Sequence, residues 1–207
     1  MSAPDSALIA DNLAVLRGDR TLFEGVSFTV RSGSAVLLRG PNGAGKSSLL
    51  LTIAGVLKPS AGRIRVEGAD DEGYLQRLHF VGHQTGVKAR LSLRENLEFW
   101  AALYGAPRET PEKALENVGL GGLGGLEAGY LSAGQTRRLA LARLLVAHRP
   151  IWLLDEPSSA LDAEGDAMLG RLVATHLSKG GILVAATHQP LALPETTAAT
   201  LLLGGGA

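Results

Sequence analysis

The chain has 207 residues and is 45% hydrophobic, which is enough for one domain with a sizeable core. Its 20 basic side chains balance its 20 acidic ones, and this zero net charge argues against a general nucleic-acid-binding surface. The absence of cysteine excludes disulfides and thiolate metal sites, and the sequence shows neither a signal peptide nor an apolar run of the roughly 20 residues that a membrane-spanning helix needs.

Short strands dominate the pattern of the first part of the chain. Residues 28–30 and 35–38 flank a turn, and residues 63–67 alternate between apolar and polar side chains, so all three segments are expected to be strands. The apolar run over residues 46–57 predicts a helix. Another short apolar segment, at residues 79–83, predicts a further strand.

The next part of the chain, about residues 88–149, is expected to be a helical block. Trp100 and Tyr104 recur with other apolar residues at helical spacing, which predicts that they pack inside this block. The Thr-Pro pair at residues 110–111 predicts a helix start, because proline is favoured in the first helical turn. After a glycine-rich loop, a long helical run is expected over residues 135–148.

Strands and helices alternate again after this block. Residues 151–155 and 182–187 are apolar throughout, which is typical of strands buried on both faces. Residues 201–203 predict a last strand at the sheet edge. These patterns imply an α/β fold with a parallel sheet covered on both sides. We expect residues 1–207 to form a single domain into which the helical block is inserted.

The stretch after the strand at residues 35–38 fits the phosphate-binding loop pattern G-x-x-x-x-G-K-[ST], and the helix that the pattern requires follows it. Glycines let the backbone fold closely around a polyphosphate, and the start of the helix adds the positive end of its dipole. We expect Lys46 to reach the β- and γ-phosphates and the Ser47 hydroxyl to ligate Mg²⁺. The residues expected to surround the nucleotide here are Gly40, Pro41, Asn42, Gly43, Ala44, Gly45, Lys46, Ser47 and Ser48.

Two carboxylates follow the apolar strand at residues 151–155. Asp155 and Glu156 come at its carboxyl end, which is the edge of the sheet where ligands bind in open α/β folds. Asp155 is predicted to hold Mg²⁺, directly or through water. Glu156 is predicted to polarise the attacking water as a general base.

A third signal is the run Leu131-Ser132-Ala133-Gly134-Gln135. Taken by itself it predicts a capped helix start, because Ser132 and Gln135 have the spacing of a capping box. With the two motifs above, it makes the chain resemble the ATP-binding cassette (ABC) ATPases, whose signature is usually Leu-Ser-Gly-Gly-Gln. The resemblance implies a P-loop fold of the ABC type, with an antiparallel β portion at the N-terminus. It also implies a homodimer in which Ser132 and Gly134 contact the γ-phosphate bound to the other subunit, so that each site is shared.

Three further residues match the same family by order and spacing. The resemblance implies that Gln84 senses Mg²⁺ and couples to a membrane partner, and that Asp162 is the acid of a loop that communicates between the two sites. It also implies that His188 is the switch histidine that contacts the γ-phosphate. Glu156, His188 and Gln84 are thus the expected catalytic group, and Ser47, Gln84 and Asp155 the expected Mg²⁺ group.

The chain departs from the family where the adenine is usually stacked. The family has an aromatic residue before the first long strand, roughly where this chain has Arg17. The planar guanidinium of Arg17 can stack on the base instead, and weaker discrimination of adenine is the alternative. Phe23 lies too far along the chain to take this role.

Finer features resemble the cassette of cytochrome c maturation, the ATP-binding subunit of the so-called haem exporter. They are the segments 82–88, 93–99, 131–135 and 187–191 and the short length of the chain. The resemblance implies multi-span membrane subunits as partners and a peripheral place on the cytoplasmic face of the bacterial inner membrane. It implies ATP and Mg²⁺ as the cofactors and no nucleic acid as a partner.

Several alternatives remain at this stage. One is the ATPase of another ABC exporter, and another is a soluble cassette ATPase of DNA repair or translation. Repair-type cassettes carry a long coiled coil, however, and only 46 residues separate Gln84 from Leu131 here. A third alternative is a nucleotide-binding scaffold without turnover, against which the presence of Glu156 and His188 argues.

The remaining histidines offer only a weak metal signal. His79 and His83 could share one face of a strand as a metal or haem ligand pair, although packing is the preferred interpretation. His148 and His176 fall at helix ends or faces, and we expect both to be solvated.

Overall fold

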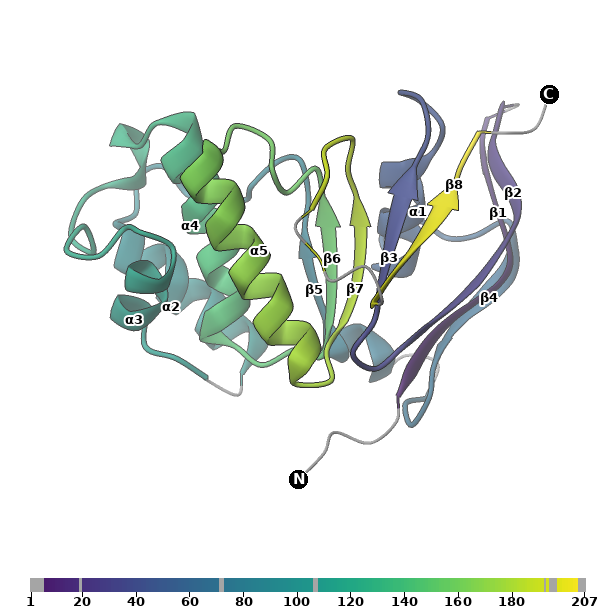
Figure 1. Cartoon of the computed structure of the whole chain (residues 1–207), viewed down its shortest axis with the longest axis horizontal. Coiled ribbons are helices and arrows are strands. Elements are labelled where there is room, and N and C mark those ends of the chain that lie inside the picture. The colour runs from purple at the N-terminus through teal and green to yellow at the C-terminus, as the bar shows by residue number, and fades with distance from the viewer. Residues whose placement is uncertain are drawn as a thin grey trace.

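The computed structural model describes the chain in six segments, which are residues 6–18, 20–70, 73–105, 108–191, 193 and 197–204. Residues 1–5, where no signal peptide is expected, lie outside these segments. Two β-sheets and a group of helices are arranged side by side, with a central parallel sheet between the helices and the second sheet (Figure 1). Among the described residues no helix is both long and apolar enough to cross a membrane.

The central sheet has five parallel strands in the order β5-β6-β7-β3-β8. Its inner strands are buried along their whole length apart from the last residue of β3, as the apolar sequence patterns predict. β8 pairs with β3 alone and is the edge strand that the leucine-rich end of the chain predicts. The strands are β3 (Ala35–Arg39), β5 (Leu78–Val81), β6 (Ile151–Asp155), β7 (Ile182–Ala186) and β8 (Ala198–Leu202).

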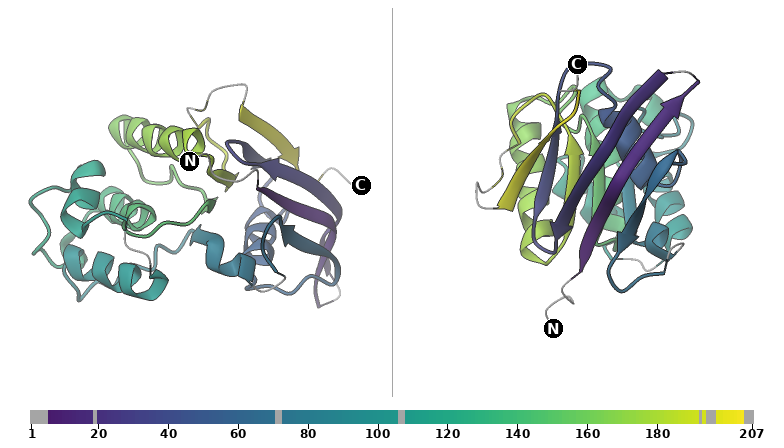
Figure 2. Two further views of the ribbon diagram at one scale, coloured as in Figure 1. Left: turned by 90° about the horizontal axis from the view of Figure 1, so that it is seen from below. Right: turned by 90° about the vertical axis from the view of Figure 1, so that its right-hand side faces the viewer.

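The second sheet is antiparallel and has the strand order β2-β1-β4. It consists of β1 (Ala7–Arg17), β2 (Arg20–Arg31) and β4 (Ala61–Val66), so it is the N-terminal β portion expected for an ABC-type fold. Figure 2 shows this curved sheet at the opposite end of the molecule from the helices that lie between residues 93 and 178, whereas helix α1 lies beside it. Helix α1 (Lys46–Ile53) contributes Leu49, Leu50 and Ile53 to a core that also contains residues of both sheets.

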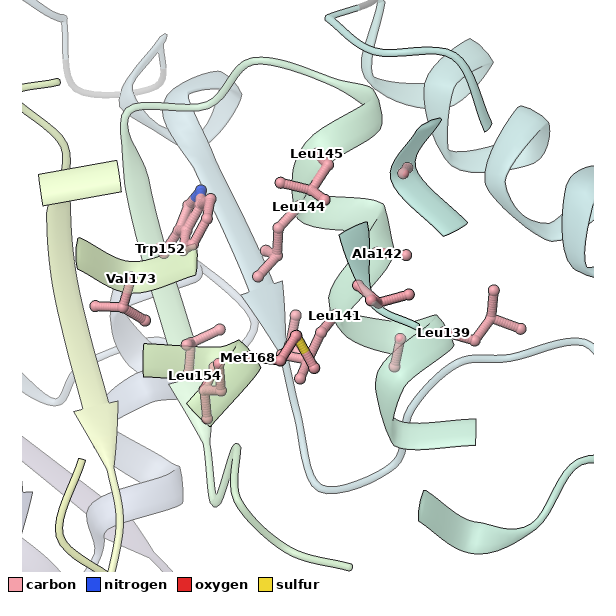
Figure 3. Packing of buried hydrophobic residues seen from close by; sticks show 14 of the residues in the cluster. Leu139, Leu141, Ala142, Leu144, Leu145, Trp152, Leu154, Met168 and Val173 are labelled. Carbon is pink, nitrogen blue, oxygen red and sulfur yellow. The ribbon is translucent and has the colours of Figure 1, made fainter. Parts of the chain in front are cut away.

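The other face of the parallel sheet is covered by helices. α4 (Ala133–Val146) and α5 (Ala163–Ser178) pack against it, while α2 (Leu93–Tyr104) and α3 (Pro111–Asn117) pack on α4. Short 3₁₀ turns lie at Gly73–Arg77 and Ala128–Tyr130, and Tyr74 of the first belongs to the core on the α1 side. Figure 3 shows how leucines of α4 meet Met168 and Val173 of α5 and Trp152 and Leu154 of β6 in one apolar cluster. Alternate residues of β6 therefore serve the two cores, since Leu153 packs on the α1 side and Leu154 on the α4 side.

Local sequence signals explain where these helices begin. Ser132 Oγ accepts from the Gln135 N–H at 3.2 Å, while Gln135 Oε1 accepts from the Ser132 N–H at 3.0 Å, which confirms the predicted capping box. Because Ser132 is its N-cap, helix α4 begins at Ala133, two residues before the predicted start. Thr110 caps α3 in front of Pro111, as the Thr-Pro pair predicts.

Two helices end earlier than the sequence patterns predict. α1 ends at Ile53 rather than at residue 57, because Gly55 takes the left-handed conformation at φ 72°. The Gly55 N–H donates to Thr52 O and the Val56 N–H donates to Leu51 O, which is the glycine-terminated helix end known as the Schellman motif. α4 ends at Val146, and its C-cap Ala147 is already extended.

The aromatic residues of α2 pack as predicted, whereas one histidine prediction is wrong. The rings of Trp100 and Tyr104 stack on each other with centroids 5.5 Å apart. His176 is 4% exposed and lies against Trp152, so it is not solvated. The stacking partner is a buried strand residue that lies 24 positions earlier in the chain, and no local pattern signals such a contact.

The possible histidine ligand pair does not form. His79 is fully buried in β5, where its Nε2 lies 3.0 Å from Ala147 O, while His83 lies beyond the end of that strand and is exposed. Among the residues described by the structure, no cluster of three or more potential metal-ligating side chains is present. His148 is exposed, as predicted.

The two buried histidines predict how stability depends on pH. Burial lowers the pKa of His79 from its ordinary value of 6.5 to about 3 and that of His176 to about 4. Below pH 6.5 the unfolded chain takes up protons that the native protein does not, so the free energy of unfolding falls as the pH drops towards 4. We expect a loss on the order of 3 kcal/mol between pH 7 and pH 5.

Urea unfolding at several pH values measures this slope. His176→Phe removes one of the two titrating groups, so the pH slope of its unfolding free energy is expected to halve. His83→Gln is the control, because His83 is exposed and its removal leaves both buried histidines in place. An unfolding free energy that stays constant from pH 7 to pH 5 would contradict the interpretation.

Candidate functional site

The phosphate-binding loop lies between β3 and α1, as predicted. Gly40 has φ 139°, and a Cβ built there would lie 2.2 Å from Leu203 O, so only glycine fits this position. Gly45 is the N-cap of α1 at φ 91°. The left-handed backbone at Gly45 turns the chain into the helix directly before Lys46 and Ser47, which are its first two residues.

The side chain of Lys46 lies folded back on its own loop. Its Nζ donates to Gly40 O at 2.8 Å and to Pro41 O at 3.0 Å, and the residue is 7% exposed. Nζ also lies 3.2 Å from His188 Nε2. Because an ammonium group only donates, Nε2 accepts in this contact. The ammonium group of Lys46 thus holds the loop in shape. The same N–H groups would donate to a bound phosphate.

The hydroxyl of Ser47 and the carboxylate of Asp155 lie next to each other at the start of α1. Ser47 Oγ lies 3.1 Å from Asp155 Oδ1, although the two residues are 108 positions apart in the sequence. Asp155 ends β6 and is 6% exposed. Hydroxyl and carboxylate oxygens are the ligands that Mg²⁺ prefers, so this pair fits the group that the sequence predicts. The structure thus brings the phosphate loop and the acidic strand end together.

Glu156 stands at the turn that follows β6. Its backbone has φ 47°, uncommon for a residue with a side chain, and its N–H donates to Ala186 O at 2.8 Å. Its carboxylate is 27% exposed and faces His188, whose N–H donates to Oε2 at 3.3 Å and whose Nε2 lies 3.5 Å from Oε1. The two predicted catalytic residues thus lie side by side at the ends of neighbouring strands.

A cavity of about 420 Å³ opens over these groups. Glu156 is the one acidic residue among the described residues that line it. Beyond the loop, the cavity reaches Arg17 at the end of β1 and Arg20 and Leu22 at the start of β2, and its described lining contains no phenylalanine, tyrosine or tryptophan. The described residues that line it are Arg17, Arg20, Leu22, Asn42, Gly43, Gly45, Lys46, Ser47, Ser48, Glu156 and His188. Phe23 instead is buried in the core.

The predicted signature lines a different cavity, of about 590 Å³. Ser132, Gly134 and Gln135 lie there, and no residue that lines this cavity lines the other one. Leu131 and Ala133 flank these residues at the start of α4. Within one chain, therefore, the signature and the phosphate loop do not form a common site.

Asp162 borders the signature cavity and caps α5. Its Oδ1 accepts from the Gly165 N–H at 2.8 Å and from Arg138 Nη2 at 2.8 Å. The hydrogen bond from Gly165, together with Arg138, lowers the pKa of this carboxyl. Asp162 thus ties the start of α5 to α4 beside the signature.

Gln84 is the one predicted catalytic residue that the structure does not bring to the nucleotide cavity. It is exposed, follows β5 by three residues and is absent from the described lining of that cavity. Its neighbourhood is nevertheless connected to the site, because Arg137 donates both to Gly82 O at 2.8 Å and to Asp155 O at 2.6 Å.

Arg137 is a residue of the site that the sequence analysis missed. It belongs to α4, is 3% exposed and also donates to Glu156 O at 2.7 Å and Pro157 O at 3.1 Å. One guanidinium group therefore satisfies four carbonyl groups and links the signature helix to the strand end that carries Glu156. A charged side chain on a helix is usually solvated, so the sequence offers no signal for this role.

Arg143, two turns later on α4, extends the same connection. It is 4% exposed, and its guanidinium donates to Thr85 O at 2.9 Å and to Phe80 O. It also lies 4.6 Å from the centre of the Trp100 ring. Burial lowers its pKa to about 10, so it keeps its charge at neutral pH. Arg137 and Arg143 thus fasten α4 to the backbone on both sides of Gln84.

Comparisons with known proteins agree with this geometry. The model of the family described as "ABC transporter" matches residues 23–159, which include the phosphate loop, the signature and the acidic strand end. Among solved structures, an ABC transporter ATP-binding protein from Pyrococcus furiosus superposes with a TM-score of 0.82 and 29% identity, over 95% of this chain and 97% of that one.

Curated relatives match nearly the whole chain. The "Cytochrome c biogenesis ATP-binding export protein CcmA" of Chelativorans sp. is 48% identical over 96% of this chain and 98% of its own length. The protein of the same name from Mesorhizobium japonicum is 48% identical over 90% of this chain and 94% of its own length. The chain is therefore an ATPase of the ABC transporter family, and within it belongs to the cytochrome c biogenesis ATP-binding export proteins.

Proposed function

We propose that the chain is the ATP-hydrolysing subunit of a haem exporter for cytochrome c maturation, and that it works with MgATP and as a homodimer. The observation that carries the ATPase part is the convergence of Lys46, Ser47, Asp155, Glu156 and His188 at one end of the parallel sheet. The names of the relatives that match nearly the whole chain support the cytochrome c part. They also argue against the soluble alternatives in DNA repair and translation.

Each residue of the cavity has its own role in the proposed hydrolysis of ATP. Lys46 exchanges Gly40 O and Pro41 O for phosphate oxygens, and the N–H groups of the loop surround the β-phosphate. Ser47 and Asp155 would hold Mg²⁺, which would offset the negative charge of the phosphates. Glu156 orients the water and accepts its proton, while His188, freed from Lys46, contacts the γ-phosphate.

Each such site is half of the complete one. The signature residues Ser132 and Gly134 line a cavity apart from the loop, so they serve a nucleotide that is bound to another copy of the chain. Ser132 is at the N-cap of α4, where the helix dipole favours an anion such as the γ-phosphate. A head-to-tail dimer therefore places two nucleotides between two chains.

Coupling to the membrane runs through the segment around Gln84. We propose that Gln84 reaches Mg²⁺ when the dimer closes and that the multi-span membrane subunits dock close by, which places the chain on the cytoplasmic face of the bacterial inner membrane. Arg137 and Arg143 support this coupling, because they link α4 to the carbonyl groups of Gly82 and Thr85 on either side of Gln84.

Complementation tests the biological part of the proposal. In a bacterium that lacks its own cytochrome c biogenesis ATP-binding export protein, the chain is expected to restore covalent haem in c-type cytochromes, detected by haem staining of gels. Glu156→Gln is expected to restore none. ATP hydrolysis by the purified chain together with an absence of complementation would refute the role in cytochrome c maturation and leave the ATPase assignment intact.

Arg17 carries a separate prediction about the base. The arginine is proposed to stack on adenine. A guanidinium plane can stack on the face of any purine, so this contact does not distinguish adenine from guanine. We expect ATP and GTP to bind with similar affinity, and Arg17→Ala to weaken both about three- to fivefold. Calorimetric titration of the two nucleotides measures this effect.

Arg65→Ala is the matched control for Arg17. Arg65 is also an exposed arginine of the antiparallel sheet, but it does not line the nucleotide cavity. If Arg17→Ala binds ATP as tightly as Arg65→Ala does, Arg17 has no part in holding the base.

A further inference from the structure

Another cavity, of about 260 Å³, lies at the opposite end of the parallel sheet from the nucleotide site. Trp152, the second residue of β6, lines this cavity, whereas Glu156 follows the end of the same strand and lines the nucleotide cavity. Parallel strands begin at one edge of a sheet and end at the other, so the two cavities face opposite edges. The last turn of α5 adds His176 to the wall.

The floor of this cavity holds a buried donor without an acceptor. Trp152 is 1% exposed and stacks on His176 with ring centroids 3.8 Å apart. Among the described residues, nothing accepts a hydrogen bond from its Nε1–H. Figure 3 shows this nitrogen at the end of the ring that points away from Leu154, on the side of Leu145, which also lines the cavity. A buried unpaired donor is costly, so an acceptor from outside the chain is expected there.

The rim of the cavity is positively charged. Arg108, Lys113 and Lys179 line it, and in the described parts of the chain none of these three side chains forms an ion pair. Among the described residues of the lining the one carboxylate is that of Glu109, whose Oε2 already accepts from Asn117 Nδ2 at 2.8 Å. The cavity thus offers several donors and three cations to a ligand.

Apolar side chains complete the wall. Leu145 of α4 and Leu172 of α5 lie beside Trp152, so the inner part of the cavity is apolar while the rim is cationic. Such a division suits a small molecule that carries an anionic group at one end. The volume is enough for a phosphate group with a compact apolar body and far too small for a nucleotide triphosphate.

We propose that this cavity binds a small phosphate-bearing molecule, with Arg108, Lys113 and Lys179 on the phosphate and the Trp152 indole at its inner end. Lys113 belongs to α3 and Lys179 follows α5, so the ligand joins the helical block to the helix that covers the sheet. The bound form is therefore stabilised against separation of these two parts.

Trp152 makes the site observable by fluorescence. The chain contains two tryptophans, so Trp100→Phe leaves Trp152 as the single emitter. The protein is first saturated with MgADP, which fills the nucleotide cavity, and is then titrated at constant ionic strength with phenyl phosphate and, separately, with inorganic phosphate. We expect a saturable change of emission with both probes and tighter binding of phenyl phosphate, because its ring fills the apolar part.

Two pairs of charge-removing substitutions make the test specific. In the Trp100→Phe background, Lys113→Gln with Lys179→Gln is expected to raise the dissociation constant at least about fivefold. Lys58→Gln with Arg65→Gln removes the same charge at exposed positions outside the cavity and is expected to leave the constant unchanged. The unfolding temperature is expected to rise more with added phenyl phosphate in the control pair than in the cavity pair.

Two results would overturn the proposal. One is an emission of Trp152 that does not saturate with either probe across the millimolar range. The other is an equal loss of affinity in both pairs of variants, which would show attraction by overall charge alone. Because MgADP fills the nucleotide cavity throughout, neither result bears on the ATPase assignment.

Discussion

Replacement of Glu156 by glutamine is expected to reduce ATP turnover by at least about a hundredfold. Glutamine keeps the shape of the side chain and can still accept from the His188 N–H, but it cannot take up a proton from water. Glu156 is the single acidic residue in the described lining of the nucleotide cavity, so no neighbour replaces it. Steady-state phosphate release at saturating MgATP measures the effect.

Binding separates this result from a loss of structure. The affinity for ATP is expected to change little, since Lys46 and the loop remain, and a fluorescent ATP analogue reports it. Glu24→Gln is the control, because Glu24 is an exposed carboxylate of β2 outside the cavity. Turnover by Glu156→Gln that equals turnover by Glu24→Gln would remove Glu156 from the mechanism.

Replacement of Arg137 by methionine is expected to lower the free energy of unfolding by about 3 to 5 kcal/mol. The guanidinium group donates to the carbonyl oxygens of Gly82, Asp155, Glu156 and Pro157, and methionine offers no donor to any of them. Arg137 is 3% exposed, so water reaches these carbonyl groups poorly once the donor is removed. Urea unfolding measures the loss.

Turnover is expected to fall in the same variant even where it remains folded, because Glu156 is held at φ 47° partly by the contact of its carbonyl with Arg137. Arg171→Met is the matched control, since Arg171 is an exposed arginine of α5. Arg137→Lys is expected to be intermediate, because an ammonium group carries fewer donors than a guanidinium. If the methionine variants at positions 137 and 171 are equally stable and active, Arg137 does not hold the site.

The parts of the site that the sequence predicts are those formed by contiguous residues. The loop around Lys46 is a local pattern, and Asp155 and Glu156 follow an apolar run whose place at the sheet edge comes from the topology of parallel strands. The 3.1 Å contact of Ser47 with Asp155 then follows, because the loop that leads to Ser47 leaves the carboxyl end of β3 and Asp155 lies at the carboxyl end of β6. The parallel sheet itself was predictable for the same reason, since its strands are apolar throughout.

The parts that the sequence did not predict depend on distant contacts. Arg137 and Arg143 look like ordinary solvated residues of a helix, and their burial arises only when α4 packs against the segment around Gln84. His176 is buried because Trp152 lies opposite it, which no local pattern shows. The early end of α1 is different, because a local signal was present. Gly55 favours a helix end, but the prediction followed the apolar run that continues to residue 57.

The buried arginines also suggest how the site and the membrane side are connected. The carbonyl group of Glu156 accepts from Arg137, which belongs to the helix whose first turn carries the signature, so in the proposed function a shift of Glu156 would be passed to that helix. Arg143 on that helix holds Thr85, next to Gln84. The signature, Glu156 and the segment around Gln84, which we propose to couple to the membrane subunits, are thus all connected through α4.

The most direct test of the account is the mass of Glu156→Gln in solution with and without MgATP. If the signature completes the site of a second copy, as we propose, the chain of 21.5 kDa is expected to sediment as a dimer of about 43 kDa with MgATP, and as a monomer with MgADP. Adding Ser132→Arg, which fills the signature cavity, is expected to abolish the dimer while ATP still binds. A protein that remains monomeric while saturated with MgATP would contradict the shared site.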